Sequence, residues 1–360
     1  MTYFCRLLVL LTFWIIGSGA NAGIMSIRVD GPDFMTVVNG GTTVNIYLDG
    51  EIDSGAATRL APILENAKKT GADVYLNSPG GSLLVGMQIG RMIRKAGFNT
   101  YVGSGQVVRD PRFDNRGVLK RVPGNCFSAC SLAFLGGWFR FMNQGSTYGV
   151  HRFSSSVGPT PTDLDSAQII SAAVGAYIRE MGVSGELFDY MVQAGKESIR
   201  LLSPNELTSL YVVNNGRLRP EWSIEAIEGG VYLRGVQHTL YGEGKVVVFC
   251  HGKGALLQSY YQAGRERSND IASGRWFHSL TTDSATLPLS NPEAIRAVDV
   301  WIETTFGISK NYLVAMSESG SIGHAMQLSR EAPTFVGFRV DIPKGKDEQK
   351  VKSFLRNCAK

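Results

Sequence analysis

The 360-residue sequence has few cysteines and histidines, five of each, and no long apolar run after its first 22 residues. It also lacks a nucleotide-binding motif, a C-x-x-C pattern and a cluster of histidines. Its formal charge of +5 is spread along the chain without a stripe of basic and aromatic residues. We therefore expect no nucleotide or nucleic-acid partner, no metal, no cofactor and no later membrane-spanning helix.

An apolar run does stand at the start. Leu7–Ile16 is almost wholly apolar, and small residues follow it up to Ala20-Asn21-Ala22. This pattern is typical of a secretory signal, and it predicts export with cleavage after Ala22, so that residues 1–22 contact the membrane only transiently. The run is shorter than the roughly 20 residues that a spanning helix needs. The alternative is an uncleaved segment that anchors the chain in the inner membrane.

Four cysteines would remain after cleavage: Cys126, Cys130, Cys250 and Cys358. An even number in an exported chain favours disulfides, and four cysteines allow three pairings. We favour Cys250 with Cys358, which would tie the end of the chain to a strand. Cys126 and Cys130 would then pair across one helical turn.

The middle of the chain alternates between strand and helix patterns. Strands are predicted at 43–49, 74–76 and 98–102, with a helix from Asp53 or Ser54 to Lys69 and another ending at Lys95 before Gly97. Such alternation favours an α/β fold with parallel pairing. Further helices are predicted at 129–135, 163–181, 185–194 and from the capping box at 203–206, and short strands at 139–142 and 148–150.

Beyond about residue 216 the pattern becomes β-rich and punctuated by glycines. We expect residues 23–40 to form a lead segment, 41–215 one domain and 222–360 a separate α+β domain of unknown role. The predicted strands there are 231–234, 245–250, 312–316 and 334–340, with one helix near 292–305. The scattered histidines of this part are expected to be surface residues or satisfied core residues: His238, His251, His278 and His324.

Three segments before residue 215 carry residue types suited to acyl transfer. Ser128 lies among small residues where a strand would turn into a helix, although a serine there can also be a mere helix cap. The turn Asn77-Ser78-Pro79-Gly80-Gly81 leaves backbone N–H groups uncovered, which suits an oxyanion hole. His151 follows a predicted strand and is the first histidine of the chain.

Together these segments resemble the Clp protease proteolytic subunit. That family shows a strand ending in Asn-Ser-Pro-Gly-Gly, a serine at a turn into a helix, and a strand ending in a catalytic histidine. The resemblance covers about residues 41–215 and implies a ClpP/crotonase-like spiral of ββα units. An exported version with a C-terminal addition is similar to the periplasmic ClpP-like proteins of Gram-negative bacteria.

The resemblance implies a role for each matched residue. Ser128 would be the nucleophile and His151 the general base, with the N–H groups of Gly81 and Ala129 as the oxyanion hole and Gly80 and Ser82 beside the substrate. The implied activity is that of a periplasmic serine endopeptidase acting on peptides or proteins. The family also implies a homo-oligomer, built through the helix after the histidine and its packing residues Leu164, Ile169, Ile170, Ala173, Ala176 and Tyr177.

The sequence departs from the family at two places. Ser198 or Ile199 stands where the family has its orienting aspartate, and Glu197 is the nearest acid, ahead of Asp163, Asp165 and Asp189. An incomplete triad leaves open a catalytically weak or inactive module that binds peptides. The arginine-rich segment 103–123 is longer than the family's link, and is expected to be a lid, a clamp for carboxylates or a solvated insertion. A crotonase-type acyl-CoA enzyme shares the fold but is not expected in an exported protein.

Overall fold

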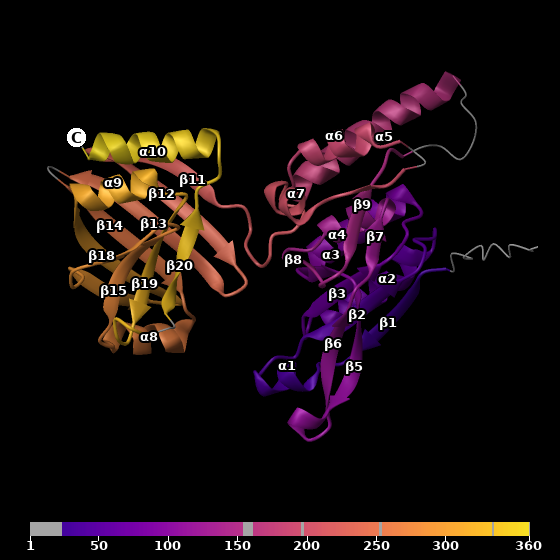
Figure 1. Cartoon of the computed structure of the whole chain (residues 1–360), viewed down its shortest axis with the longest axis horizontal. Helices are drawn as coiled ribbons and strands as arrows, with labels where there is room; N and C mark the ends of the chain where they lie inside the picture. Colours follow the sequence, from indigo (N-terminus) through magenta and orange to yellow (C-terminus); the bar gives the residue numbers. More distant parts are fainter. Residues whose placement is uncertain (1–23, 154–160, 196–197, 252–253, 333–334, 360) are drawn as a thin grey trace, which may run out of the picture.

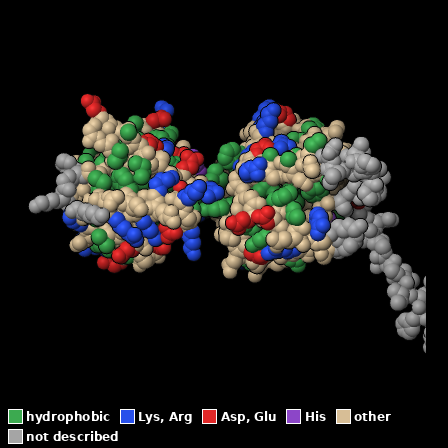
Figure 2. Space-filling view, turned by 90° about the horizontal axis from the view of Figure 1, so that it is seen from above, with side chains coloured by type: hydrophobic (Ala, Val, Ile, Leu, Met, Phe, Trp, Pro, Cys, Tyr) green, Lys and Arg blue, Asp and Glu red, His purple; other side chains and the backbone are tan. Residues whose placement is uncertain are grey.

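The computed structural model describes residues 24–153, 161–195, 198–251, 254–332 and 335–359 (Figure 1). The predicted signal segment lies outside these residues. The two largest apolar cores among these residues are built between Met25 and Val213 and between Trp222 and Cys358. Figure 2 shows the corresponding two lobes with a narrow waist between them, and with basic and acidic side chains scattered over both.

The first unit is built around a mainly parallel sheet, which confirms the α/β class. Among the described residues the strand order is β1-β2-β3-β4-β8, and only β1 runs antiparallel to its neighbour. Helices α2 (Ala56–Ala67) and α3 (Leu83–Ala96) connect consecutive parallel strands. The strands are β1 (Ser26–Asp30), β2 (Val44–Asp49), β3 (Ala72–Asn77), β4 (Asn99–Val102) and β8 (Arg140–Met142).

A smaller sheet stands beside the first and has the order β10-β9-β7. Its strands β7 (Asn125–Phe127) and β9 (Thr147–Val150) are parallel, and β10 (Arg200–Leu201) is antiparallel to β9. The fully buried helix α4 (Ala129–Leu135) follows β7 directly. The remaining helices of this unit are α5 (Pro161–Glu180), α6 (Glu186–Gln193) and α7 (Pro204–Ser209).

Local signals placed most helix ends correctly. Gly97 ends α3 in a left-handed conformation with φ 80°, and the capping box at Ser203 and Glu206 is formed. The predicted cap of α2 was wrong, because the helix begins after Gly55. The Asp53 carboxylate instead binds the Arg59 guanidinium, at 2.6 and 2.9 Å, and the N–H of Met25.

The arginine-rich segment 103–123 forms a packed hairpin. Its strands are β5 (Ser104–Asp110) and β6 (Arg116–Val122), with the short turn η1 (Pro111–Phe113) between them. Four stacked aromatic rings lie on the main sheet: Tyr47, Tyr75, Tyr101 and Phe141. The hairpin packs against this row of rings through Leu119 of β6. At its tip Phe113 contacts Phe34 of helix α1 (Phe34–Val38), and the Asp33 carboxylate accepts the N–H of Leu119 at 3.0 Å.

The second unit pairs two antiparallel sheets. Within the described residues their orders are β11-β12-β13-β14-β18-β17 and β16-β15-β19-β20. The strands are β11 (Glu221–Ile227), β12 (Gly230–Thr239), β13 (Gly242–His251), β14 (Gly254–Gln262), β15 (Phe277–Thr282), β16 (Thr286–Pro288), β17 (Ala294–Val298), β18 (Trp301–Ser309), β19 (Ser321–Gln327) and β20 (Val336–Asp341). The helices are α8 (Arg265–Ser273), α9 (Lys310–Glu318) and α10 (Lys346–Cys358).

Two expectations for this unit were wrong. The helix near 292–305 is the hairpin β17–β18, in which every second residue of β18 from Ile302 onward is buried, a period that only a strand produces. The strand at 312–316 is part of α9, whose buried residues Leu313, Met316 and Ser317 have helical spacing. Ser309 is the last residue of β18 and the N-cap of α9. The spacing of buried residues therefore changes from two to about 3.6 at this point, within one apolar stretch.

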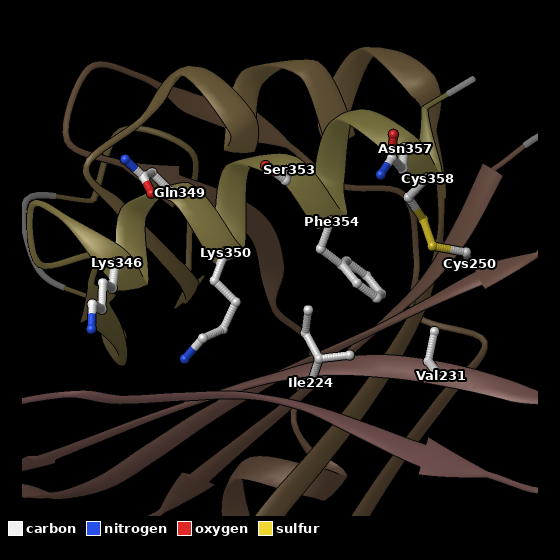
Figure 3. A pocket seen from close by; sticks show the side chains of 10 residues that line it. All are labelled: Ile224, Val231, Cys250, Lys346, Gln349, Lys350, Ser353, Phe354, Asn357 and Cys358. Carbon is white, nitrogen blue, oxygen red and sulfur yellow. A yellow bond between two sulfur atoms is a disulfide. The ribbon is translucent and has the colours of Figure 1, made fainter.

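Both favoured disulfides are present. Cys126 pairs with Cys130 and Cys250 with Cys358, each with Cα atoms 5.2 Å apart. The second bond joins β13 to α10, the last helix of the chain, and lies at one end of a groove under that helix (Figure 3). It closes a loop across 108 positions, whereas Cys126–Cys130 closes a loop across four.

Replacing both Cys250 and Cys358 with serine should lower the free energy of unfolding by about 2–5 kcal/mol, because a long cross-linked loop restricts the unfolded chain most. The matched control replaces Cys126 and Cys130, which close the short loop. Urea denaturation of both variants provides the comparison. A loss for Cys250/Cys358 no greater than for the control would contradict the expectation.

Candidate functional site

Ser128 stands at a sharp turn between β7 and α4. Its backbone has φ 57° and ψ −123°, a combination that costs a residue with a side chain about 1–3 kcal/mol. The Ser128 N–H donates to the carbonyl of Gly149 at 3.2 Å. Its hydroxyl forms no capping hydrogen bond to α4, so this serine is not a helix cap in the ordinary sense. A strained, half-buried serine at a strand-to-helix turn has the form of a nucleophile elbow.

His151 lies at the same end of the small sheet as Ser128. Strands β7 and β9 are parallel, with Phe127 opposite Gly149, so the chain leaves both strands in one direction. The His151 ring contacts the carbonyl of Arg152 through Nδ1 at 2.9 Å. Because a carbonyl only accepts, Nδ1 carries a proton in this contact, and in the neutral ring Nε2 would keep its lone pair. Within residues 24–153, no hydrogen bond joins Ser128 to His151.

Gly80 lies directly against the serine. Its φ is 111°, and a methyl group built on it would be 2.6 Å from Ser128 Cβ and 2.8 Å from the carbonyl oxygen of Phe127. No side chain fits there without moving the elbow. The Gly80 N–H donates to Ser78 Oγ at 3.1 Å, so the buried serine of the turn holds this glycine in place.

Two backbone N–H groups near Ser128 have no acceptor among the described residues. Ile52 bonds to the residues on either side of Gly81, accepting from Ser82 at 2.8 Å and donating to Gly80 at 2.7 Å, so the N–H of Gly81 is left over. Ala129 opens α4, where N–H groups have no partner inside the helix. Gly81 is exposed, whereas Ala129 is fully buried.

Asn77 and Ser78 attach the glycine turn to the serine strand. The Asn77 side chain donates to Asp49 at 3.1 Å and accepts the N–H of Asn125 at 3.0 Å. Backbone bonds join Ser78 to Asn125 at 2.7 Å and to Phe127 at 3.1 Å. The ends of β2, β3 and β7 are therefore tied together immediately before the two elements of the site.

The Cys126–Cys130 disulfide spans Ser128 in the chain. Both cysteines are fully buried and lie two residues on either side of the serine. The crosslink therefore joins the last strand residues to the first turn of α4 and closes the elbow covalently.

The described residues place no carboxylate on His151. The antiparallel register Arg200 with Val150 carries Ile199 opposite His151, and Ile199 is 45% exposed. Glu197 lies outside the described residues, as do the side chains of Asp163 and Asp165. Asp189 is exposed on α6 and, among the described residues, makes no hydrogen bond or ion pair with a residue of the site. The assignment of Glu197 as the third member of the triad therefore stays a prediction. The placement of Ser82 beside the substrate also stays a prediction.

The second unit contains two cavities that sequence patterns could not have predicted. One is the groove of about 790 Å³ under α10, where Phe354 faces Ile224 and Val231 of the sheet (Figure 3). The other is lined by His278 and lies at the four-stranded sheet. Both are assembled from residues far apart in the chain.

The chain was compared with protein-family models and with curated protein sequences, and neither comparison found a match.

Replacing Gly80 with alanine should displace the Ser128 elbow and lower the rate of serine modification by a fluorophosphonate at least about tenfold, which corresponds to about 1.4 kcal/mol. Gly97→Ala is the matched control, because Gly97 also has a positive φ but has no atom within 4 Å of an added methyl group. Mass spectrometry would measure the labelling rate of both folded variants. Equal rates would show that Gly80 does not shape the elbow.

Proposed function

We propose that the chain is an exported ClpP-like serine endopeptidase that acts through Ser128 and His151. The observation that carries the proposal is the strained backbone of Ser128 at the end of β7, in parallel register with the strand that leads to His151. The free N–H groups of Gly81 and Ala129 add an oxyanion site next to it. A mainly parallel sheet with a small second sheet that carries the serine and the histidine is in keeping with a ClpP/crotonase spiral.

In this proposal His151 Nε2 accepts the proton of Ser128 as Oγ attacks the carbonyl carbon of a peptide bond. The carbonyl oxygen becomes an anion, which the N–H groups of Gly81 and Ala129 stabilise. The C–N bond then breaks, and the leaving amine takes the proton from His151. Water attacks the acyl-serine by the same route in reverse, returning its proton through His151 and releasing the carboxylate.

The partner of the His151 ring suggests a slow enzyme. The Arg152 carbonyl fixes the tautomer that a general base needs, but it carries no charge to stabilise the imidazolium. In a triad enzyme, replacing the orienting aspartate lowers kcat by about 10⁴-fold when the histidine also adopts the wrong tautomer. Two observations favour a second candidate, an inactive module that binds peptides. Ala129 is fully buried, and among the described residues no hydrogen bond joins Ser128 to His151.

The two disulfides indicate an oxidising compartment, and we propose that the protein is located in the periplasm. Two disulfides are formed, and no helix in the described part is long and apolar enough to cross a membrane. Self-association through α5 is part of the proposal. Ile169 is 70% exposed on that helix, whereas Tyr177 is buried and donates to the carbonyl of Leu132, so Tyr177 belongs to the core and not to a contact surface.

A fluorophosphonate probe at pH 7.5 should label the wild-type chain once, and Ser128→Ala should abolish the label. His151→Gln should slow labelling at least about 100-fold, since general-base catalysis contributes about 10²–10⁴-fold. His238→Gln is the control, because this half-exposed histidine pairs with Glu243 on the second unit. Absence of label on the folded wild type with both disulfides intact would favour the peptide-binding module.

Reduction of Cys126–Cys130 should slow this labelling by about tenfold, because the crosslink restrains a backbone conformation that costs about 1–3 kcal/mol. The Cys126→Ser/Cys130→Ser variant should behave like the reduced protein and should not respond to reductant. An unchanged labelling rate in that variant would mean that the disulfide does not hold the elbow.

A further inference from the structure

The second unit contains a cavity of about 990 Å³, at the upper end of the range for small-ligand pockets. It lies where β15 meets its neighbours β16 and β19, and the segment before β17 completes its wall. Apolar side chains supply much of the lining, among them Trp276, Leu289 and Ile295. Such a cavity, open to solvent on one side, offers a site for an apolar group.

His278 is one of two buried polar residues of this lining, the other being Ser279. It belongs to β15 and is 7% exposed. Its Nδ1 contacts Nε2 of His324 at 3.0 Å, and its own Nε2 has no partner among the described residues. The structure thus leaves one polar nitrogen available at the wall of the cavity.

A hydrogen-bonded relay lies behind His278. His324 is fully buried, and its Nδ1 is 2.7 Å from Ser259 Oγ. Burial lowers the pKa of His324 to about 3 and also lowers the pKa of His278, so both rings are neutral at pH 7. Each ring then carries one N–H, and the relay has only two arrangements of its protons.

The Ser259 hydroxyl selects between these arrangements. It is buried and has no other acceptor among the described residues, so its proton goes to Nδ1 of His324. The proton of His324 is then on Nε2 and is donated to Nδ1 of His278. His278 therefore carries its own proton on Nε2, where it acts as a donor toward the cavity.

The charge of the lining also favours an acceptor ligand. Arg275 and Arg330 line the cavity, and no aspartate or glutamate of the described ranges does so. Neither arginine forms an ion pair with another residue in the described ranges, and Arg330 lies over the ring of Phe277 at 5.6 Å. A fixed neutral donor, two cations and apolar walls together suit a carboxylate attached to an apolar group.

We propose that this cavity binds an organic carboxylate that carries an apolar group, with His278 Nε2–H donating to the carboxylate and the two arginines balancing its charge. Two sources share this chemistry: the C-terminal residue of a peptide, and a small aryl or alkyl acid. The site belongs to the second unit and does not depend on catalysis at Ser128.

Isothermal titration calorimetry on the full exported chain carrying Ser128→Ala, so that no peptide is cleaved, tests the proposal. The probes are a tetrapeptide ending in leucine with a free carboxylate, the same peptide as its amide, and 4-phenylbutyrate. At least one acid should bind, and the amide should bind at least about tenfold more weakly than the peptide acid if the peptide is the source. Binding of 4-phenylbutyrate alone would identify the small acid as the source.

His278→Phe keeps a ring in the core but removes the donor, and should weaken binding of the acid at least about tenfold. His238→Phe should leave it unchanged. Failure of both acids to bind, equal binding of acid and amide by the peptide, or full binding by His278→Phe would overturn the proposal. Nitrogen-15 NMR of histidine in the otherwise wild-type chain needs no core substitution: His278 should be protonated on Nε2, and protonation on Nδ1 would overturn the assigned relay.

Discussion

The first unit depends on one contact, in which the backbone of Gly80 lies against the side of Ser128. A methyl group at Gly80 would come within 2.6 Å of Ser128 Cβ, so the strained turn at φ 57° exists only because this position is a glycine. The strain is held by bonds on each side. Ser78 and Asn77 attach the glycine turn to β7, and the Cys126–Cys130 crosslink closes the other side.

The same close packing places the helix behind the serine. A methyl group at Gly86 of α3 would lie 2.5 Å from the carbonyl oxygen of Ala129, so α3 and α4 touch through backbone. The two helices therefore leave no room for adjustment near the elbow. A rigid support of this kind suits the nucleophile proposed at Ser128. The proposed base is less restrained, because the one hydrogen bond that its ring makes in the described part of the chain is the contact of His151 Nδ1 with the Arg152 carbonyl.

Sequence patterns predicted the parts of the fold that local chemistry determines. Alternating apolar segments gave the parallel sheet, and Gly97 and the Ser203 capping box marked helix ends where they are found. Patterns failed where tertiary partners decide, as in 292–305, which pairs into a hairpin. Ser128 and His151 could be selected because each sits at a strand end. The relay through His324 and His278 could not, because Ser259 lies 65 positions away from His324 and meets it only in the folded sandwich.

The central claim is that Ser128 is a nucleophile beside a two-donor oxyanion site. A crystal structure of the chain after reaction with a small fluorophosphonate tests it most directly. The account predicts phosphorus bonded to Ser128 Oγ, with one phosphoryl oxygen about 2.7–3.1 Å from the backbone nitrogens of Gly81 and Ala129. An unmodified Ser128, or an adduct whose oxygen points away from both nitrogens, would contradict it.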